Sequence, residues 1–353
     1  MSPISKRVGF LPTLFLSLLF FAFSAAIVLA QSNAQSNSKD NPGGGGLKIA
    51  AAGDIMMGTE NSLPPDGGAG FFKDVAPYLK DRDLVIGNLE GPLTDRGAPT
   101  KTIVPGRSYC FRTPPAYGRL LKEAGFTAMS LANNHANDYG PEGRAQTVEV
   151  LEDLGIAHAG APGEVAVFRA NDREVAFLAL APNRGCQNIN DIDAAVNLVK
   201  KSLRENPDRL VFVSFHGGAE GTAHMVLPHG PELYLGENRG DLIKLSHALI
   251  DAGAAAVIGH GPHVPRAVEV YKDHLIAYSL GNFATAAGIN VKGATGLAPL
   301  LLFEVDEKGQ LVKYEIVSFR QQMNKGPKLD PSGEAANVMG DLTKRLASEL
   351  AAK

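Results

Sequence analysis

The stretch LKIAAAGDIMMG, residues 47–58, is an apolar run that ends in Gly53 and Asp54. A short apolar run that stops at Gly-Asp is typical of a buried strand that ends in a loop. Similar runs recur along the chain at 83–87, 127–131, 174–181, 209–215 and 255–258. Helical spacing lies between them at 71–80, 114–124, 141–154, 191–204 and 241–252. Strands that alternate with helices indicate an α/β fold. Two late hairpins, at 266–278 and 300–318, add antiparallel strands, so we expect a mixed sheet or two packed sheets.

The composition excludes several classes of protein. The chain has 353 residues, of which 44% are hydrophobic and 20% charged, and its formal net charge is −3. These values exclude a disordered chain, a collagen-like repeat and a polytopic membrane protein. They also argue against a nucleic-acid partner, which would require a basic surplus to neutralise phosphates. The two cysteines, Cys110 and Cys186, are too few for a disulfide scaffold or a cysteine-based zinc site; one disulfide and two free thiols both remain open.

The beginning of the chain has the pattern of an export signal. Lys6 and Arg7 precede an uncharged, largely apolar run at 8–30, which ends in Val28-Leu29-Ala30, a small–x–small cleavage pattern. The run is also long enough to span a bilayer. We therefore expect a signal peptide or signal anchor over 1–30 and a periplasmic or extracellular location, with residues 8–30 as the membrane anchor if they are not removed.

Three further segments follow this signal. Residues 31–46, QSNAQSNSKDNPGGGG, are polar and glycine-rich, which predicts a flexible linker. Residues 47–325 are long enough for one large domain with its own core. Residues 326–353 are expected to form a C-terminal tail that contains a helix.

Side chains that can bind a metal follow five of the expected strands directly. They are Asp54, Glu90, Asn134 with His135, His216, and His260 with His263. Each one alone could be a turn residue, a helix cap or a structural histidine. The carboxyl ends of strands in α/β sheets converge in space, however, so their joint occurrence favours one site. Oxygen and nitrogen ligands without thiolate suit Mn, Fe or Zn, and six such ligands suggest one or two divalent ions.

Six motifs in this order make the chain recognisable. They are GDIMMG at 53–58, NLEGPLT at 88–94, NNHANDYG at 133–140, HGGAE at 216–220, GHGPHV at 259–264 and YSLGNF at 278–283. Together they resemble the CapA family of poly-γ-glutamate capsule synthesis proteins, which is similar to the calcineurin-like metallophosphoesterases. The resemblance covers about 47–319 and implies a four-layer αββα sandwich of the metallophosphoesterase type.

The resemblance also implies a role for each matching residue. Glu90 would bridge two metal ions. One ion would be completed by Asn134, His216 and His260, and the other would be held by Asp54 and His263. His135 matches the histidine that protonates the leaving oxygen in metallophosphoesterases. The candidate catalytic residues within these motifs are His135, Asp138 and Glu220.

The sequence departs from these family patterns at three positions. Met56 stands where metallophosphoesterases have a histidine, so one ion would lose a nitrogen ligand. Gly217 and Gly221 stand where CapA proteins usually have a tryptophan and another aromatic residue, which implies a more open loop after His216.

Three functions remain open from the sequence. The first is an exported CapA-like protein that takes part in the synthesis of poly-γ-glutamate or a related capsule polymer, through a metal-binding site. The second is a general exported, metal-dependent phosphoesterase. The third is a degenerate metal-binding module that only holds a partner. Whether the chain is an enzyme of the hydrolase class is left open. The expected partners are an anionic polymer or a phosphorylated small molecule, together with a membrane-bound polymer synthase.

Overall fold

The computed structural model describes residues 45–59, 62–104 and 108–352, and these residues fall within one compact unit. The predicted signal segment at 1–30 and nearly all of the predicted linker at 31–46 lie outside them. Among the helices that are described, none is both long enough and apolar enough to cross a bilayer.

The first sheet is mixed and has eight strands. In spatial order, seven of them are β17 (Gly326–Leu329), β16 (Leu311–Gln322), β15 (Leu297–Val305), β1 (Leu47–Met56), β2 (Leu84–Leu89), β3 (Ala128–Ser130) and β4 (Ala157–Ala159). The eighth, β14 (Asn282–Thr285), pairs in parallel with the end of β1. Strands β1 to β4 are parallel to one another, so their carboxyl ends meet at one edge of the sheet.

The second sheet has seven strands, and its central strands are also parallel. In spatial order, six of them are β12 (Val268–Tyr271), β13 (His274–Ala277), β11 (Ala256–His260), β8 (Leu210–His216), β6 (Arg173–Ala181) and β5 (Ala166–Ala170). The seventh, β7 (Gln187–Asn188), pairs with the end of β6. A separate small hairpin is formed by β9 (Leu233–Tyr234) and β10 (Glu237–Asn238).

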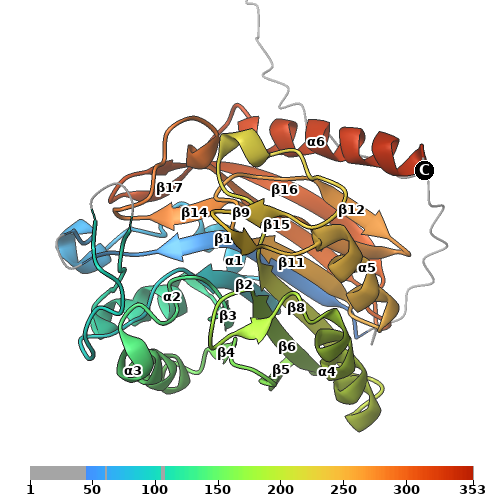
Figure 1. The fold of residues 1–353 in the computed structure, drawn as a ribbon, viewed down its shortest axis with the longest axis horizontal. Helices are drawn as coiled ribbons and strands as arrows, with labels where there is room; N and C mark the ends of the chain where they lie inside the picture. Colours follow the sequence, from blue (N-terminus) through green and yellow to red (C-terminus); the bar gives the residue numbers. More distant parts are fainter. Residues whose placement is uncertain (1–44, 60–61, 105–107, 353) are drawn as a thin grey trace, which may run out of the picture. The chain divides into compact units, whose positions relative to one another are not determined.

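Helices cover the outer faces of the two sheets (Figure 1). They are α1 (Ala76–Leu79), α2 (Gly118–Ala124) and α3 (Gly140–Asp153) against the first sheet, and α4 (Ile192–Glu205) and α5 (Leu242–Asp251) against the second. The last helix, α6 (Glu334–Ala351), packs on β12, β15 and β16 and so spans both sheets. Short 3-10 turns lie at Pro65–Gly68, Pro115–Tyr117, Thr222–His224 and Gly293–Gly296.

Three clusters of buried apolar side chains separate four layers. The first cluster lies between the sheets and contains Ile49 of β1 and Phe212 of β8. The second joins the first sheet to its helices and contains Leu121 of α2. The third joins the second sheet to its helices and contains Val199 of α4 and Leu245 of α5. The predicted α/β fold and its four-layer αββα arrangement are therefore confirmed.

The start of the predicted helix over 71–80 is wrong. Residues before Ala76 form turns, and α1 covers Ala76–Leu79 alone. Pro77 lies in the first turn of this helix, where its missing N–H is tolerated. A helix that began at 71 would place Pro77 in its interior, where the ring clashes with the preceding turn.

An irregularity in β1 decides which way Asp54 faces. Up to Ala51, odd-numbered residues of β1 face the cluster between the sheets, but Ile55 and Met57 belong to the cluster on the helix side. The pairing with β2 and with β14 shifts register on either side of Asp54. A slip of one residue exchanges the two faces of a strand, so Asp54 faces the space between the sheets.

Gly53 is required at this irregularity. A Cβ atom on Gly53 would lie 2.1 Å from the carbonyl oxygen of Gly281. We predict that Gly53→Ala lowers the free energy of unfolding by about 3 kcal/mol, because the two backbones must separate. Around Gly340, in the interior of α6, no other part of the described chain lies within 4 Å of the Cβ position, apart from the backbone of the helix itself. Gly340→Ala should therefore raise stability by about 0.5–1 kcal/mol. Urea unfolding measures both, and equal effects of the two substitutions would contradict the role of Gly53.

Candidate metal centre

The predicted ligands lie where carboxyl ends of strands from both sheets meet. Asp54 in β1 stands opposite Asn88 of β2 and Asn282 of β14 in the first sheet. His216 in β8 stands opposite His260 of β11 in the second sheet. All five side chains are at most 1% exposed. The two sheets thus present an oxygen-rich group and a pair of imidazoles to the same buried space.

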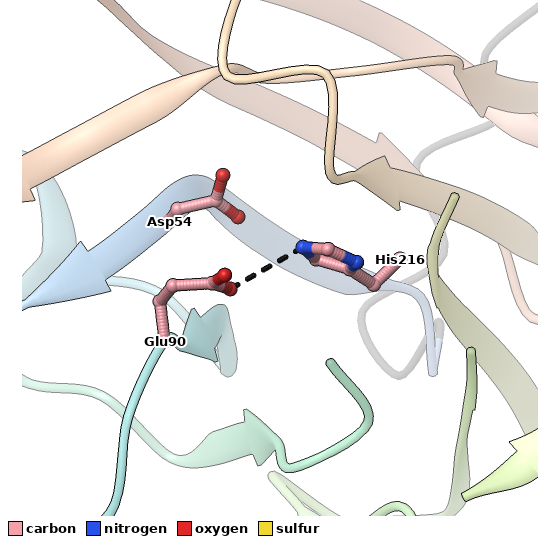
Figure 2. A group of neighbouring side chains, drawn as sticks. All are labelled: Asp54, Glu90 and His216. Carbon is pink, nitrogen blue, oxygen red and sulfur yellow. Dashed lines mark ion pairs between the residues drawn. The ribbon is translucent and has the colours of Figure 1, made fainter. Parts of the chain in front are cut away.

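Three of the ligands predicted from the sequence form a group that could hold a metal ion. Asp54, Glu90 and His216 each offer a ligand atom, and these atoms all lie within 4.8 Å of one another. Figure 2 shows Glu90, which directly follows β2, pointing toward the imidazole of His216, with the Asp54 carboxylate next to it. The His216 Nε2 and Glu90 Oε2 atoms are 3.4 Å apart.

Asn88, which the sequence reasoning missed, joins the two carboxylates. Its Nδ2 group donates hydrogen bonds to Asp54 Oδ1 at 2.8 Å and to Glu90 Oε2 at 2.6 Å. Its Oδ1 accepts a hydrogen bond from Asn133 Nδ2 at 3.0 Å. Asn88 was quoted within the second motif, and its position two residues before Glu90 on a strand of period two was the available signal.

Several buried oxygen and nitrogen atoms of the site, each able to bind a metal, have no hydrogen-bond partner among the described residues. They are Glu90 Oε1, Asn134 Oδ1 and both ring nitrogens of His216 and of His260. A buried polar atom without a partner costs about 1–3 kcal/mol, and native proteins contain few of them. Their concentration here fits a divalent cation, because carboxylate oxygen, amide oxygen and imidazole nitrogen are the ligand types that such ions bind.

His263 has a different environment from His216 and His260. Its Nδ1 lies 3.0 Å from Asp54 Oδ2 and 2.9 Å from Asn282 Oδ1, so this nitrogen faces two acceptors. Burial lowers the pKa of His263, but the hydrogen bond and the charge of Asp54 outweigh it and raise this pKa to about 10. His263 is therefore protonated at neutral pH and donates to Asp54 through Nδ1; Nε2 could bind a metal only after it loses its own proton.

The imidazoles also set the charge of the two carboxylates. Burial raises the pKa of Asp54, but the nearby imidazoles of His260 and His263, of which His263 is hydrogen-bonded to it, outweigh burial and hold this pKa well below its usual range. Burial likewise raises the pKa of Glu90, and the adjacent imidazole of His216, whose Nε2 lies 3.4 Å from Oε2, lowers it below its usual value. Both carboxylates are consequently anionic at neutral pH, which is the state that binds a cation.

His135 and Asp138 form a buried pair beside this group. The His135 Nδ1 and Asp138 Oδ2 atoms are 2.6 Å apart. Asp138 also accepts from the Phe111 amide at 2.7 Å and from Lys101 Nζ at 2.6 Å. The Phe111 ring packs on the His135 imidazole, with 4.2 Å between ring centroids. These contacts fix the orientation of the imidazole; sequence reasoning missed Lys101 and Phe111, whose loop position gave no signal.

The remaining candidate, Glu220, lies at the edge of the site. It is partly exposed and forms an ion pair with Arg239, with 3.2 Å between Glu220 Oε1 and Arg239 Nη2. It is close enough to His263 to contribute to the raised pKa of that residue. Among the described residues, no hydrogen bond or ion pair joins Glu220 to the His135–Asp138 pair, so the three candidate catalytic residues fall into two places.

The pattern of the chain matches a known protein family. The model of the bacterial capsule synthesis protein PGA_cap matches residues 48–287. The chain belongs to this family. It is 32% identical over 258 residues to the capsule biosynthesis protein CapA of Bacillus anthracis, across 69% of this chain and 60% of the relative. It is 29% identical over 257 residues to the PGA biosynthesis protein CapA of Bacillus subtilis (strain 168), across 69% of this chain and 64% of the relative. The resemblance to CapA proteins is confirmed, and the matches span less than two thirds of these relatives.

Two solved structures are similar to this chain, with low TM-scores and low sequence identity. The 5′-nucleotidase precursor from Thermus thermophilus has a TM-score of 0.46 and 14% identity, over 86% of this chain and 59% of that one. The NAD nucleotidase of Haemophilus influenzae has a TM-score of 0.43 and 10% identity, over 85% and 56% of the two chains. The fold described above rests on the strand order and the three apolar clusters.

Two further sequence expectations concern Met56 and the cysteines. Met56 is 2% exposed, and the position at which the metallophosphoesterase pattern has a histidine therefore carries no imidazole in this chain. Cys110 and Cys186 are both buried and both free, so of the two alternatives left open the structure has two thiols.

Asn88 offers a test of the carboxylate pair. We predict that Asn88→Asp lowers the free energy of unfolding in chelator by about 3 kcal/mol, because it replaces a shared donor with a third anion. This value corresponds to the loss of roughly two hydrogen bonds to charged groups. Asn197→Asp, at an exposed position of α4, should change stability by less than about 0.5 kcal/mol. Urea unfolding of both variants in chelator provides the measurement, and an Asn88 variant as stable as the parent would remove Asn88 from the site.

Proposed function

We propose that this chain binds one or two divalent metal ions between its sheets and takes part in the synthesis of a capsule polymer, poly-γ-glutamate or a related one. The main support for the metal site is a set of buried oxygen and nitrogen atoms that have no hydrogen-bond partner. They lie on Glu90, Asn134, His216 and His260. Membership of the PGA_cap family and the similarity to CapA proteins support the role in capsule synthesis. Mn, Fe and Zn all suit this donor set.

Several residues would hold the metal. Asp54 and Glu90 supply anionic oxygen, Asn134 supplies amide oxygen, and His216 and His260 supply imidazole nitrogen, with His263 next to Asp54. A bound divalent ion acts as a Lewis acid, which stabilises negative charge that develops on a phosphoryl or carbonyl oxygen. The chain itself orients these ligands through the register of β1 with β2 and of β8 with β11.

The His135–Asp138 pair favours a second candidate function, a metal-dependent phosphoesterase. Asp138 accepts the hydrogen bond from Nδ1 of His135, which leaves Nε2 as the nitrogen that can exchange a proton with a substrate. An imidazole oriented in this way can give a proton to a leaving oxygen. Such general acid catalysis contributes about 10²–10⁴-fold to a rate.

We also propose that the protein is exported. The support is the basic start of the chain, the apolar run at 8–30 and the polar, glycine-rich stretch at 31–46. Cleavage after Ala30 and retention of the run as a membrane anchor are both compatible with this pattern. In either case the partners would be an anionic polymer or a phosphorylated small molecule, and a membrane-bound polymer synthase.

Loss of one imidazole tests the metal site. We predict that His216→Ala and His260→Ala each lower the metal content of the purified protein to well below that of the parent, because each removes a ligand nitrogen. His274→Ala is the matched control, since His274 lies at the start of β13, at the opposite end of the second sheet, and contacts the Ala255 carbonyl. Elemental analysis measures the content; if both site variants retain the parental amount, the assignment is wrong.

Loss of His135 distinguishes the two functions. In a phosphoesterase, His135→Ala should lower turnover of a phosphoester with a poor leaving group by about 10²-fold, and turnover of 4-nitrophenyl esters by less, because that leaving group needs less protonation. Metal content should stay at the parental level. His247→Ala is the control, since His247 pairs with Glu269 instead.

The capsule role has its own readout on the same variants. Absence of phosphoester turnover in the parent, with surface polymer lost in His216→Ala cells, would leave the capsule role without the hydrolase. Equal rate losses on both kinds of ester would remove the general acid role from His135.

A further inference from the structure

An ion pair between Arg266 and Glu232 lies buried against the loop that follows His216. The Arg266 side chain is fully buried, and that of Glu232 is 4% exposed. The guanidinium binds the carboxylate in a bidentate manner, with distances of 2.7 Å from Nη1 to Oε1 and 2.9 Å from Nη2 to Oε2. Such a pair must overcome the cost of removing two charges from water, so it adds little to stability on balance.

The pair is bonded to the middle of the His216 loop. Arg266 Nη2 donates to the Ala219 carbonyl at 3.1 Å, and Glu232 Oε2 accepts from the Ala219 amide at 2.9 Å. Both backbone groups of Ala219 are therefore fixed by this one ion pair. A Cβ atom on Gly218 would lie 2.8 Å from Arg266 Nη1, so the chain passes the guanidinium as closely as glycine allows.

Arg266 also belongs to the loop that carries the other two histidines. It lies three residues after His263, and its amide donates to the Ser279 carbonyl at 3.0 Å. The backbones of the two loops are bonded directly as well, from the Gly217 amide to the His260 carbonyl and from the Gly221 amide to the Pro262 carbonyl, each at 2.9 Å. The Arg266 side chain thus adds a side-chain cross-link to these backbone bonds between the His216 loop and the His260–His263 loop.

We propose that Arg266 and Glu232 are positioning residues that hold the histidine-bearing loops after β8 and β11 in the geometry that binds metal. Among the described residues, no hydrogen bond or ion pair joins this pair to a proposed ligand, so it acts through Ala219 and the 260–266 turn. The metal part of this inference rests on the proposed function, whereas the loop geometry stands on the contacts above.

The double substitution Arg266→Met with Glu232→Met removes the pair without leaving an unpaired buried charge. Because apolar replacement of a buried ion pair is often neutral for stability, the variant should unfold at a denaturant concentration close to that of the parent. It should nevertheless release the Ala219 amide. We expect hydrogen exchange of the peptide 216–224 to be at least about tenfold faster, and Zn²⁺ to bind about 10–100-fold more weakly, as is common when groups that orient ligands are lost.

A matched control uses the other end of β8. Arg209 precedes this strand, and its Nη2 pairs with Glu174 at 2.7 Å, with Arg209 8% exposed. Arg209→Met with Glu174→Met removes an arginine–glutamate pair that is less buried, since Glu174 is 32% exposed, and should leave exchange of 216–224 and the affinity for Zn²⁺ unchanged. Arg266→Lys keeps the charge but loses the bidentate geometry, so its exchange rate should lie between those of the parent and the double variant.

Two measurements on these proteins decide the proposal: hydrogen exchange by mass spectrometry and Zn²⁺ titration by calorimetry. Parental protection of 216–224 in the folded double variant would overturn the positioning role. If the double variant does not fold, Arg266→Lys decides it, since unchanged exchange in that variant would overturn the proposal too. If the parent itself binds no Zn²⁺, the metal function fails, while the exchange result still tests the cross-link on its own.

Discussion

Two carboxylates, Asp54 and Glu90, lie close together in the buried space between the sheets, and the other residues of the site are arranged to stabilise their charges. Each is at most 1% exposed, so neither charge can be stabilised by water. Burying like charges together is expensive unless donors and cations surround them. Asn88 donates to both, and imidazoles from the second sheet lie against both. The demand for positive charge at this point explains why donors converge on it from both sheets.

The location of this site could be predicted from the sequence, because strand ends are the most regular feature of an α/β sheet. Along β8 and β11, residues of even number face the space between the sheets, and His216 and His260 continue this alternation. Asp54 does not follow it, since the register slip beside Gly53 reverses the faces of β1. That slip depends on the approach of Gly281, a residue more than two hundred positions later, which no local pattern reveals.

Other features escaped prediction for similar reasons. β14 has only four residues, and its pairing with β1 brings Asn282 opposite Asp54. A strand so short gives no periodic signal. The contacts of Lys101 with Asp138 and of Arg266 with Glu232 join distant loops, and each depends on the folded arrangement. The sequence thus indicated Asp54, Glu90 and His216, which the structure brings together, and tertiary packing decides how their side chains are held.

Two parts of the site are held in place by different sets of contacts. The ligands on β1, β8 and β11 are held by sheet register, whereas the turn that carries His135 is held by the Lys101 side chain and the Phe111 amide, which both donate to Asp138. Metal binding and proton transfer are therefore separable in principle. The most direct test of the central claim is an anomalous difference map from crystals grown with Zn²⁺ and measured at the zinc edge. The account predicts a peak about 2.0–2.2 Å from ligand atoms of Asp54, Glu90 and His216. A map without a peak between these side chains would contradict it.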